Sequence, residues 1–289
     1  MEKEFKEKIQ AEIKKSGFPL ELEITEKLRE QDHALVFSNV AYQSPDNSIK
    51  EIDVVAILQD EENEWDIGPV GTQIIIECKK SDKYPWVFFE DVYDPLVALG
   101  LLGRADYLTD LELTFNNSLM MGVAHSPLNG HYYNDFNIST TKTYFEAFKT
   151  GNEPTTIYKA VLNVLHGRKF LRDSFVRQFE SRSKDKKKFR TFLKQYVIVY
   201  DGKLVTAAKN GDDFDLAETN HVILRTRDTI ANQEQDYLGE EILIDVVKRE
   251  YFDQYITLSQ KGIELFNKHL KSIRNSDLFN SFVNIQAES

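Results

Sequence analysis

Apolar residues at helical spacing predict two helices at the start of the chain. The stretch 3–15 is short and highly charged, and a turn follows it. In the stretch 18–31, Leu20, Ile24 and Leu28 recur every four residues, which places them on one face of a helix. We therefore expect two consecutive helices, the second of them with an apolar face.

The next apolar runs predict strands. Residues 33–42 are typical of one strand, and residues 52–58 and 73–78 of two more. The last two runs are rich in β-branched residues and almost continuously apolar, as expected of strands covered on both faces. An acidic loop, 59–71, joins them, which favours antiparallel neighbours.

Mixed patterns fill the middle of the chain. We expect a helical region over 86–107 that breaks at Asp94-Pro95, and then a strand over 118–124. The polar and aromatic segment 125–143 has no clear period and is expected to be irregular.

The second half of the chain predicts helices followed by strands. Residues 157–178 and 186–194 have helical patterns. Asp201-Gly202 stands between two apolar runs, which is a strong hairpin signal. The elements expected from here on are strands over 196–200, 203–207, 221–225 and 242–247 and an amphipathic helix over 248–270.

The absence of repeats, low-complexity tracts and clear linkers predicts a single domain. We expect it to span residues 1–271, with a frayed tail over 272–289. Its parts would be a core over about 17–125, a helical basic segment over about 151–195, and a β-hairpin with a C-terminal helix over about 196–271.

Composition excludes several classes of protein. The 289 residues are 41% hydrophobic, which is ordinary for a globular chain. The single cysteine, Cys78, excludes an internal disulfide framework and suits a reducing, cytoplasmic location. The charged N-terminus has no apolar stretch for a signal peptide, and no segment approaches the roughly 20 apolar residues of a membrane helix.

Charge is distributed unevenly along the chain. The formal net charge of −11 argues against a general nucleic-acid coat. Residues 166–194, however, contain 11 Lys and Arg against 3 Asp and Glu. Such a stretch is either a solvated helix face or a focused surface for binding a polyanion.

Charged residues at the ends of two apolar runs are the best candidates for chemistry. Alternation along a strand puts Glu77 and Lys79 on one side and Cys78 on the other. If the two strands are antiparallel neighbours, Asp53 and Glu77 converge at one end of the sheet. Two carboxylates and a main-chain carbonyl form a hard-oxygen site suited to Mg²⁺ or Mn²⁺.

The apolar surroundings make these charges unusual. Asp53 lies between Ile52 and Val54, and Glu77 follows a run of three isoleucines. Acidic groups in such strands are costly to bury unless they are paired or bound to metal. Lys79 could simply pair with Glu77, or it could stabilise negative charge that develops on phosphorus.

These segments together resemble a known superfamily. GFPLE (17–21), KEIDVVAI (50–57), IIIECKKS (74–81) and KYPWVFF (83–89) are similar to the PD-(D/E)xK, or restriction-endonuclease-like, nucleases of the stand-alone prokaryotic type. Ile52 precedes Asp53 where the motif name implies proline, a position that the superfamily holds loosely.

The resemblance implies a fold, a cofactor and roles for residues. The fold would be α/β, a restriction-endonuclease-like mixed central sheet flanked by helices, with a C-terminal α/β elaboration. Asp53, Glu77 and the Cys78 carbonyl would bind Mg²⁺ or Mn²⁺, and Glu21, rather than Glu23, would be the helical carboxylate that completes the metal site. Asp53, Glu77, Lys79 and Glu21 would be the catalytic residues. Water, oriented by the metal or by Lys79, would attack the scissile phosphate in line.

The resemblance also implies a substrate, most often double-stranded DNA. The basic stretch then becomes a candidate for contacts with the phosphate backbone. The residues singled out for this are Arg168, Lys169, Arg172, Lys186, Lys187 and Lys188.

Competing functions stay open at this point. The leading hypothesis is a Mg²⁺-dependent DNA endonuclease that serves prokaryotic or phage defence, a role that rests on family association alone. A repair or junction nuclease, or an RNase, would use the same site. A non-catalytic nucleic-acid-binding or assembly subunit is the alternative from another class. A homodimer and a regulatory partner are both compatible with the sequence.

Two further features are expected to be structural. Cys78 is more often a core residue than a nucleophile in such a strand, and the six histidines show no spacing typical of zinc. Trp86, Phe88 and Phe89 could stack on bases, but aromatic residues at this spacing more often fill a core.

Overall fold

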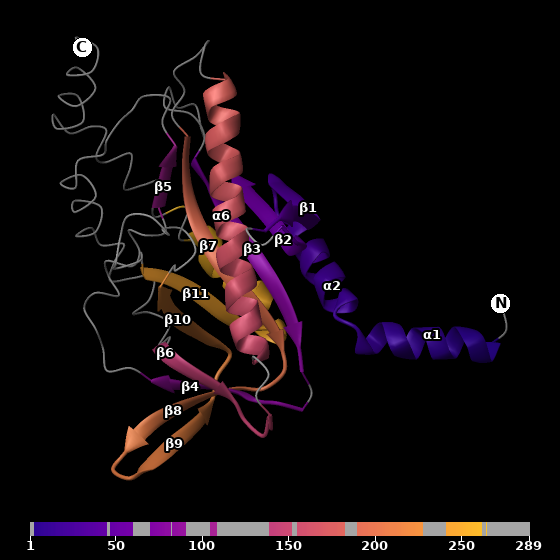
Figure 1. Cartoon of the computed structure of the whole chain (residues 1–289), viewed down its shortest axis with the longest axis vertical. Coiled ribbons are helices and arrows are strands. Elements are labelled where there is room, and N and C mark those ends of the chain that lie inside the picture. The colour runs from indigo at the N-terminus through magenta and orange to yellow at the C-terminus, as the bar shows by residue number, and fades with distance from the viewer. Residues whose placement is uncertain are drawn as a thin grey trace.

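The protein has a mixed α/β architecture in which helices flank one large sheet (Figure 1). The computed structural model describes residues 3–44, 47–59, 70–81, 83–90, 105–108, 139–151, 155–182, 190–227, 241–261 and 264. None of the helices in these ranges is long and apolar enough to cross a membrane.

The sheet has eleven strands within the described ranges. Their order is β1-β2-β3-β7-β11-β10-β6-β4-β8-β9, and β5 pairs with β7 outside this path. The strands are β1 (Ala34–Gln43), β2 (Ile49–Gln59), β3 (Val70–Lys80), β4 (Trp86–Glu90), β5 (Ala105–Leu108), β6 (Ser139–Glu146), β7 (Arg190–Asp201), β8 (Leu204–Asn210), β9 (Asp213–Glu218), β10 (His221–Arg227) and β11 (Glu241–Lys248). The helices are α1 (Lys3–Lys15), α2 (Phe18–Arg29) and α6 (Thr156–Arg182), and the 3₁₀ turn η2 (Arg249–Tyr251) leads into a helical segment over 252–261.

The centre of the sheet combines antiparallel and parallel pairs. β2 pairs antiparallel with β1 and with β3, as the loop between the two apolar runs indicated. β3 then pairs in parallel with β7, and β7 in parallel with β11. A parallel pair needs a long crossover, and α6 lies within the one that joins β3 to β7.

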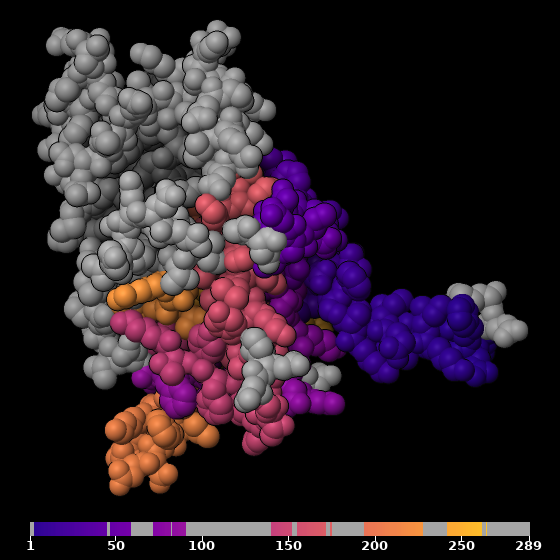
Figure 2. Space-filling view, in the orientation of Figure 1, coloured from indigo at the N-terminus to yellow at the C-terminus, as the bar shows by residue number. Residues whose placement is uncertain are grey.

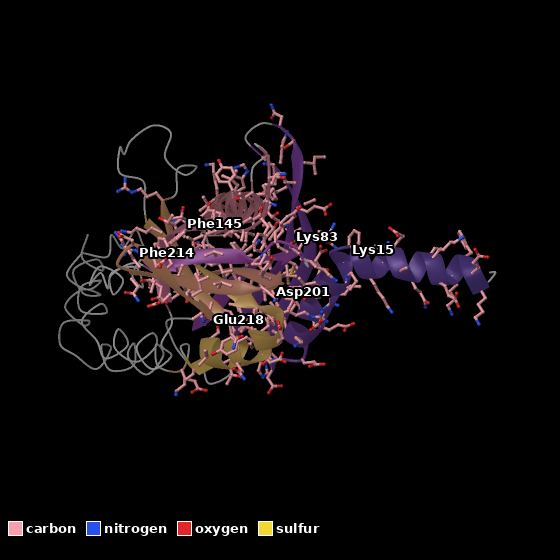
Figure 3. The ribbon with its side chains drawn as sticks, turned by 90° about the horizontal axis from the view of Figure 1, so that it is seen from below. Lys15, Lys83, Phe145, Asp201, Phe214 and Glu218 are labelled. Carbon is pink, nitrogen blue, oxygen red and sulfur yellow. The ribbon has the colours of Figure 1, made fainter. Side chains whose placement is uncertain are left out.

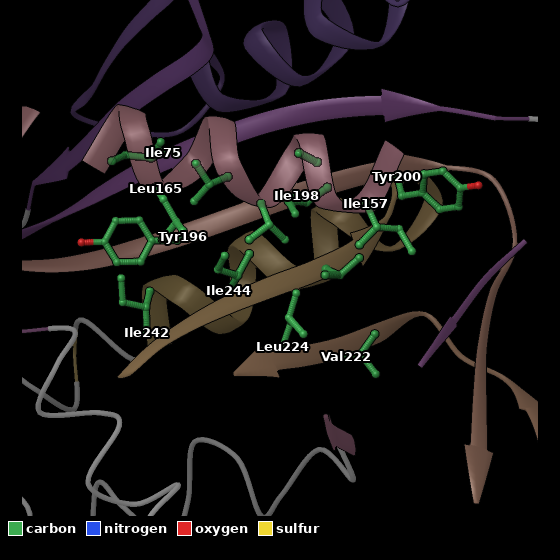
Figure 4. Packing of buried hydrophobic residues seen from close by; sticks show 14 of the residues in the cluster. Ile75, Ile157, Leu165, Tyr196, Ile198, Tyr200, Val222, Leu224, Ile242 and Ile244 are labelled. Carbon is green, nitrogen blue, oxygen red and sulfur yellow. The ribbon is translucent and has the colours of Figure 1, made fainter. Parts of the chain in front are cut away.

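Helices cover both faces of this central part. On one face α6 packs over Ile75, Tyr196 and Ile198 (Figure 4). On the other, Leu20 and Ile24 of α2 and the segment 252–261 pack against alternate residues of the same strands. The two-sided cover explains why these strands are continuously apolar.

The prediction of a helical region over 86–107 is wrong at both ends of that range. Trp86–Glu90 is β4, and Ala105–Leu108 is β5. The aromatic run of β4 lies between β6 and β8, and Trp86 stacks on Tyr200 with ring centroids 3.9 Å apart. Pairing with distant strands, which a local pattern does not report, decides the conformation here.

Two other boundaries also differ from expectation. The helix expected over 186–194 is wrong from Arg190 onward, because this stretch begins β7 and pairs with β3 and β5. The segment expected to be irregular includes Ser139–Thr143, which belongs to β6. The strand expected over 118–124, and residues 125–138, 183–189 and 272–289, lie outside the described residues.

The hairpin expected at Asp201-Gly202 is not formed. β7 and β8 follow each other in the chain but have different neighbours in the sheet. The tight hairpin joins β8 to β9 instead, where Asn210 faces Asp213 and Gly211 has a φ of 61°. The sequence analysis missed β9, whose residues are all exposed and therefore lack an apolar signal.

α1 has no buried residue. It extends away from the rest of the molecule, and its C-terminal end, which we call its root, lies beside α2 (Figures 1 and 2). Figure 3 places Lys15, at that root, on the side of the molecule where Lys83 and Asp201 lie, with Phe145 and Phe214 on the opposite side.

Candidate functional site

The predicted charged residues lie where the ladder between β2 and β3 opens. The last pair of that ladder is Val54 with Ile76, after which β2 continues only with β1, and β3 only with β7. Asp53 and Glu77 are the next residues on the two strands. Backbone groups that lose their strand partner at such a point need other hydrogen bonds.

Asp53 supplies one of these hydrogen bonds. Its Oδ2 accepts the backbone N–H of Cys78 at 2.7 Å. β2 is irregular here, because Ile52 and Val55 contact the same core cluster although residues three apart in a regular strand lie on opposite faces. The Asp53 carboxylate is thereby held between the separating strands, close to Glu77.

Glu77 is almost fully buried and is held by two other side chains. Its Oε1 accepts a hydrogen bond of 2.7 Å from Asn163 Nδ2 on α6, and it forms an ion pair with Lys79. Lys79 Nζ also donates to the Cys78 carbonyl oxygen at 3.1 Å. Glu77 and Lys79 therefore share a side of β3, as alternation predicted.

The carboxylate of α2 comes from the opposite face of the sheet. The apolar face of α2 orients the helix so that Glu21 is half-buried near Asp53 and Lys79. Glu23, the other helical candidate, pairs instead with Arg249 at 2.5 Å and with Lys27 at 3.6 Å. Of the two glutamates, Glu21 is the one that belongs to this cluster.

Burial dominates the electrostatics of the cluster. Desolvation raises the pKa of Glu21 and of Asp53, and it raises the pKa of Glu77 to about 7. The neighbouring carboxylates raise the pKa of Lys79, although burial opposes this, so the amine is charged at neutral pH. Burial also raises the pKa of the Cys78 thiol well above its usual value, which excludes Cys78 as a thiolate nucleophile under ordinary conditions.

The donor set is chemically suited to a divalent cation. Asp53, Glu77, Glu21 and the Cys78 carbonyl all present oxygen, which Mg²⁺ and Mn²⁺ prefer. Among the described residues, no group of three or more His, Cys, Asp or Glu side chains is already arranged as a ligand set. Lys79 and Asn163 hold Glu77 at present, so a cation would compete with Lys79 for this carboxylate.

Asn163 is a member of the site that the sequence analysis missed. It lies on α6, far from the motif in the chain, and its amide holds the buried carboxylate. An asparagine in a polar helix has no sequence signal that connects it to Glu77. Only the packing of α6 on β3 brings the two together.

The structure separates the residues predicted to bind nucleic acid. Arg168 does not fit that role, because it is buried and its Nε donates to the Tyr196 hydroxyl at 3.1 Å. Lys169 is partly buried, and the side chain of Arg172 lies outside the described part of the structure. Lys186, Lys187 and Lys188 also lie outside it.

The aromatic residues after the motif are split between core and surface. Trp86 and Phe88 are fully buried in β4, as core residues, while Phe89 is partly exposed beside Phe145 and Phe214. Trp86 and Phe88 are therefore not available to stack on bases.

Comparisons with known proteins return nothing: no family model, no curated protein and no solved structure matches this chain.

Proposed function

We propose that the protein is a metal-dependent nuclease that hydrolyses phosphodiester bonds of DNA on a restriction-endonuclease-like fold. The observation that carries the proposal is the position of Asp53, Glu77 and Lys79. A buried carboxylate, a partly buried carboxylate and a charged amine meet where two adjacent strands separate. Buried charges of this kind are concentrated at functional sites.

The carboxylates are suited to hold a cation. Asp53, Glu77 and the Cys78 carbonyl would bind Mg²⁺ or Mn²⁺, and Glu21 would complete the set. When bound, the cation would supply Lewis-acid activation of the phosphate and of water. Cation binding requires ionised carboxylates, and ionisation of Glu77 is half complete at a pH of about 7.

Lys79 is suited to an electrostatic role. Its raised pKa keeps the amine protonated at neutral pH, so it is a poor general base. A charged amine beside the carboxylates can stabilise negative charge that builds up on a phosphate in the transition state. It can also orient a water molecule through the N–H donor that is not directed at Glu77 or the Cys78 carbonyl oxygen.

Nuclease assays with four substrates test the proposal. Plasmid DNA, single-stranded DNA, RNA and a four-way junction would be incubated with the protein in Mg²⁺ or in EDTA. We expect cleavage of duplex DNA in Mg²⁺ only. Preferential cleavage of RNA or of the junction would support the proposed catalytic site but contradict duplex DNA as its substrate.

Variants connect the activity to the site. We expect Asp53→Asn, which removes a ligand of the proposed cation, and Lys79→Ala, which removes a charge that stabilises the transition state, each to lower the cleavage rate by at least about 100-fold. Lys83→Ala changes an exposed lysine nearby and serves as the matched control. Equal cleavage by both variants and the wild type would contradict the proposal. No cleavage of any substrate would favour a non-catalytic binding subunit.

A further inference from the structure

α1 presents an apolar stripe that nothing in the described structure covers. Phe5, Ile9 and Ile13 recur every four residues, and their exposed fractions are 56%, 38% and 51%. Isolated helices of fewer than about 12–15 residues are marginal in water, and α1 has 13 residues. A stable α1 therefore calls for a second apolar surface against this stripe.

Charges of alternating sign follow one flank of the stripe. Glu4 pairs with Lys8 at 2.7 Å, and Glu12 pairs with Lys15 at 2.8 Å, so all four side chains lie along one side of the helix. At 100° per residue, this side is next to Phe5 and Ile9. The opposite flank, with Lys6 and Gln10, shows no such alternation.

We infer that α1 pairs with α1 of a second copy of the chain in an antiparallel, two-fold arrangement. In antiparallel helix pairs the same flank of each helix meets its counterpart. Glu4 then faces Lys15 of the second copy, and Lys8 faces Glu12, so that the row is complementary to itself along its whole length. Parallel pairing would instead place the row against the Lys6 flank and bring lysines together.

A hydrogen bond from β3 fixes the root of α1, so that the rest of the helix is free to pair with a second copy. Lys80 Nζ, at the end of β3, donates to the Lys14 carbonyl oxygen at 3.1 Å. Phe18 and Leu22, at the start of α2, are also exposed. Since α1 points away from the sheet (Figure 1), antiparallel pairing leaves the two protein bodies at opposite ends of the helix pair.

Sedimentation equilibrium of the full chain tests the stripe. We expect the wild type to dimerise and Ile9→Lys to raise the dimer dissociation constant by at least about 100-fold, because each dimer loses two buried isoleucines. Ile49→Lys is the matched control, since Ile49 is also exposed and lies on β2. The circular dichroism spectra and melting temperatures should confirm that both variants fold.

A charge exchange tests the direction of pairing. One variant, Glu4→Lys with Glu12→Lys, has a uniformly basic row, and the other, Lys8→Glu with Lys15→Glu, has a uniformly acidic row. Each should self-associate at least about tenfold more weakly than the wild type, and mixing them should restore dimers. A monomeric wild type, a dimer unaffected by Ile9→Lys, or a mixture that does not associate would each overturn the inference. None of these readouts depends on nuclease activity.

Discussion

The carboxyl group of Glu77 is both buried and close to other charges, and so its ionisation is linked to folding. A carboxylate whose folded pKa exceeds its unfolded value binds more protons in the folded state. The stability that this proton provides is complete below the ordinary value of 4.5 and is lost as the pH rises through about 7. At pH 8 the folded protein therefore contains a buried charge whose cost is only partly offset by Lys79 and Asn163.

The pH dependence of stability tests this linkage. Between pH 5 and pH 8 the free energy of unfolding should fall by as much as about 3 kcal/mol through Glu77. Mg²⁺ should offset this loss at pH 8 and have little effect at pH 5. Urea unfolding at both values would measure it. Glu77→Gln should flatten the dependence and remove the Mg²⁺ effect, whereas Glu26→Gln, an exposed change on α2, should leave both as in the wild type.

Asn163 should set the pH at which the site becomes active. Its hydrogen bond favours the ionised form of Glu77, so Asn163→Ala should move the rising limb of the pH–rate profile to higher pH. Cleavage measured from pH 6 to 9 would show the displacement. Asn210→Ala removes an exposed asparagine that donates to Asp215, at the far hairpin, and should leave the profile in place. An unmoved profile for Asn163→Ala would show that this amide has only a structural role.

At the scale of the elements, the turn that follows β7 is closely packed around Gly202. A Cβ at Gly202 would approach the Ser81 carbonyl oxygen to 2.6 Å and the Tyr200 ring to 2.5 Å. Tyr200 in turn donates to the Tyr84 carbonyl oxygen at 2.7 Å and stacks on Trp86. Glycine is thus required for the close approach that fixes the segment immediately after Lys79 and Lys80.

Gly202→Ala should therefore be strongly destabilising, by at least about 2 kcal/mol, because backbone atoms must move to admit the methyl group. Gly211→Ala is a comparison of a different kind: nothing lies within 4 Å of the added Cβ, and the φ of 61° is the only obstacle. Its cost should be about 1 kcal/mol. Thermal unfolding of the two variants would measure the difference, and equal effects would contradict the steric argument.

The elements that sequence analysis located correctly are those whose patterns are local. α2, β2 and β3 carry their own periodicity or β-branched runs, and Asp53 and Glu77 could be placed near each other on adjacent strands from these runs alone. The runs did not show that β2 begins earlier, at Ile49, and that β3 continues to Lys80. β4 and β9 could not be located in this way. The aromatic run at Trp86 fits a helix or a strand by pattern, and it is extended because it pairs with β6 and β8. β9 is an exposed edge strand without an apolar face.

For the whole molecule, the same distinction decides how much of the site was predictable. The charges near each other in sequence, Glu77 and Lys79, were correctly placed on one side of a strand by alternation, and the structure shows that they form an ion pair. The partner from α6, Asn163, and the burial of Arg168 depend on a crossover that no local pattern reports. The prediction of a hairpin at Gly202 was wrong for a related reason, because β8 pairs with β4 and β9 and not with β7.

Hydrogen exchange should reveal this organisation. Amides of β3 between Ile74 and Ile76 are protected by ladders on both sides and should exchange only through global unfolding. Amides of β9, at the edge of the sheet, should exchange much faster. Mass spectrometry of peptides from the two strands would measure the ratio. Faster exchange in β3 than in β9 would show that the centre of the sheet opens independently.

The parallel pairing of β3 with β7 has a consequence for the protein while it is being synthesised. Glu21, Asp53, Glu77 and Lys79 all leave the ribosome early, yet β7 and the α6 asparagine follow only after many more residues have been translated. Until then the strand that carries Glu77 has an unpaired edge, and its carboxylate remains in water. An incomplete chain would therefore contain every charged residue of the centre without the environment that gives them their properties, so the cation binding and cleavage proposed above would both require translation to be well advanced.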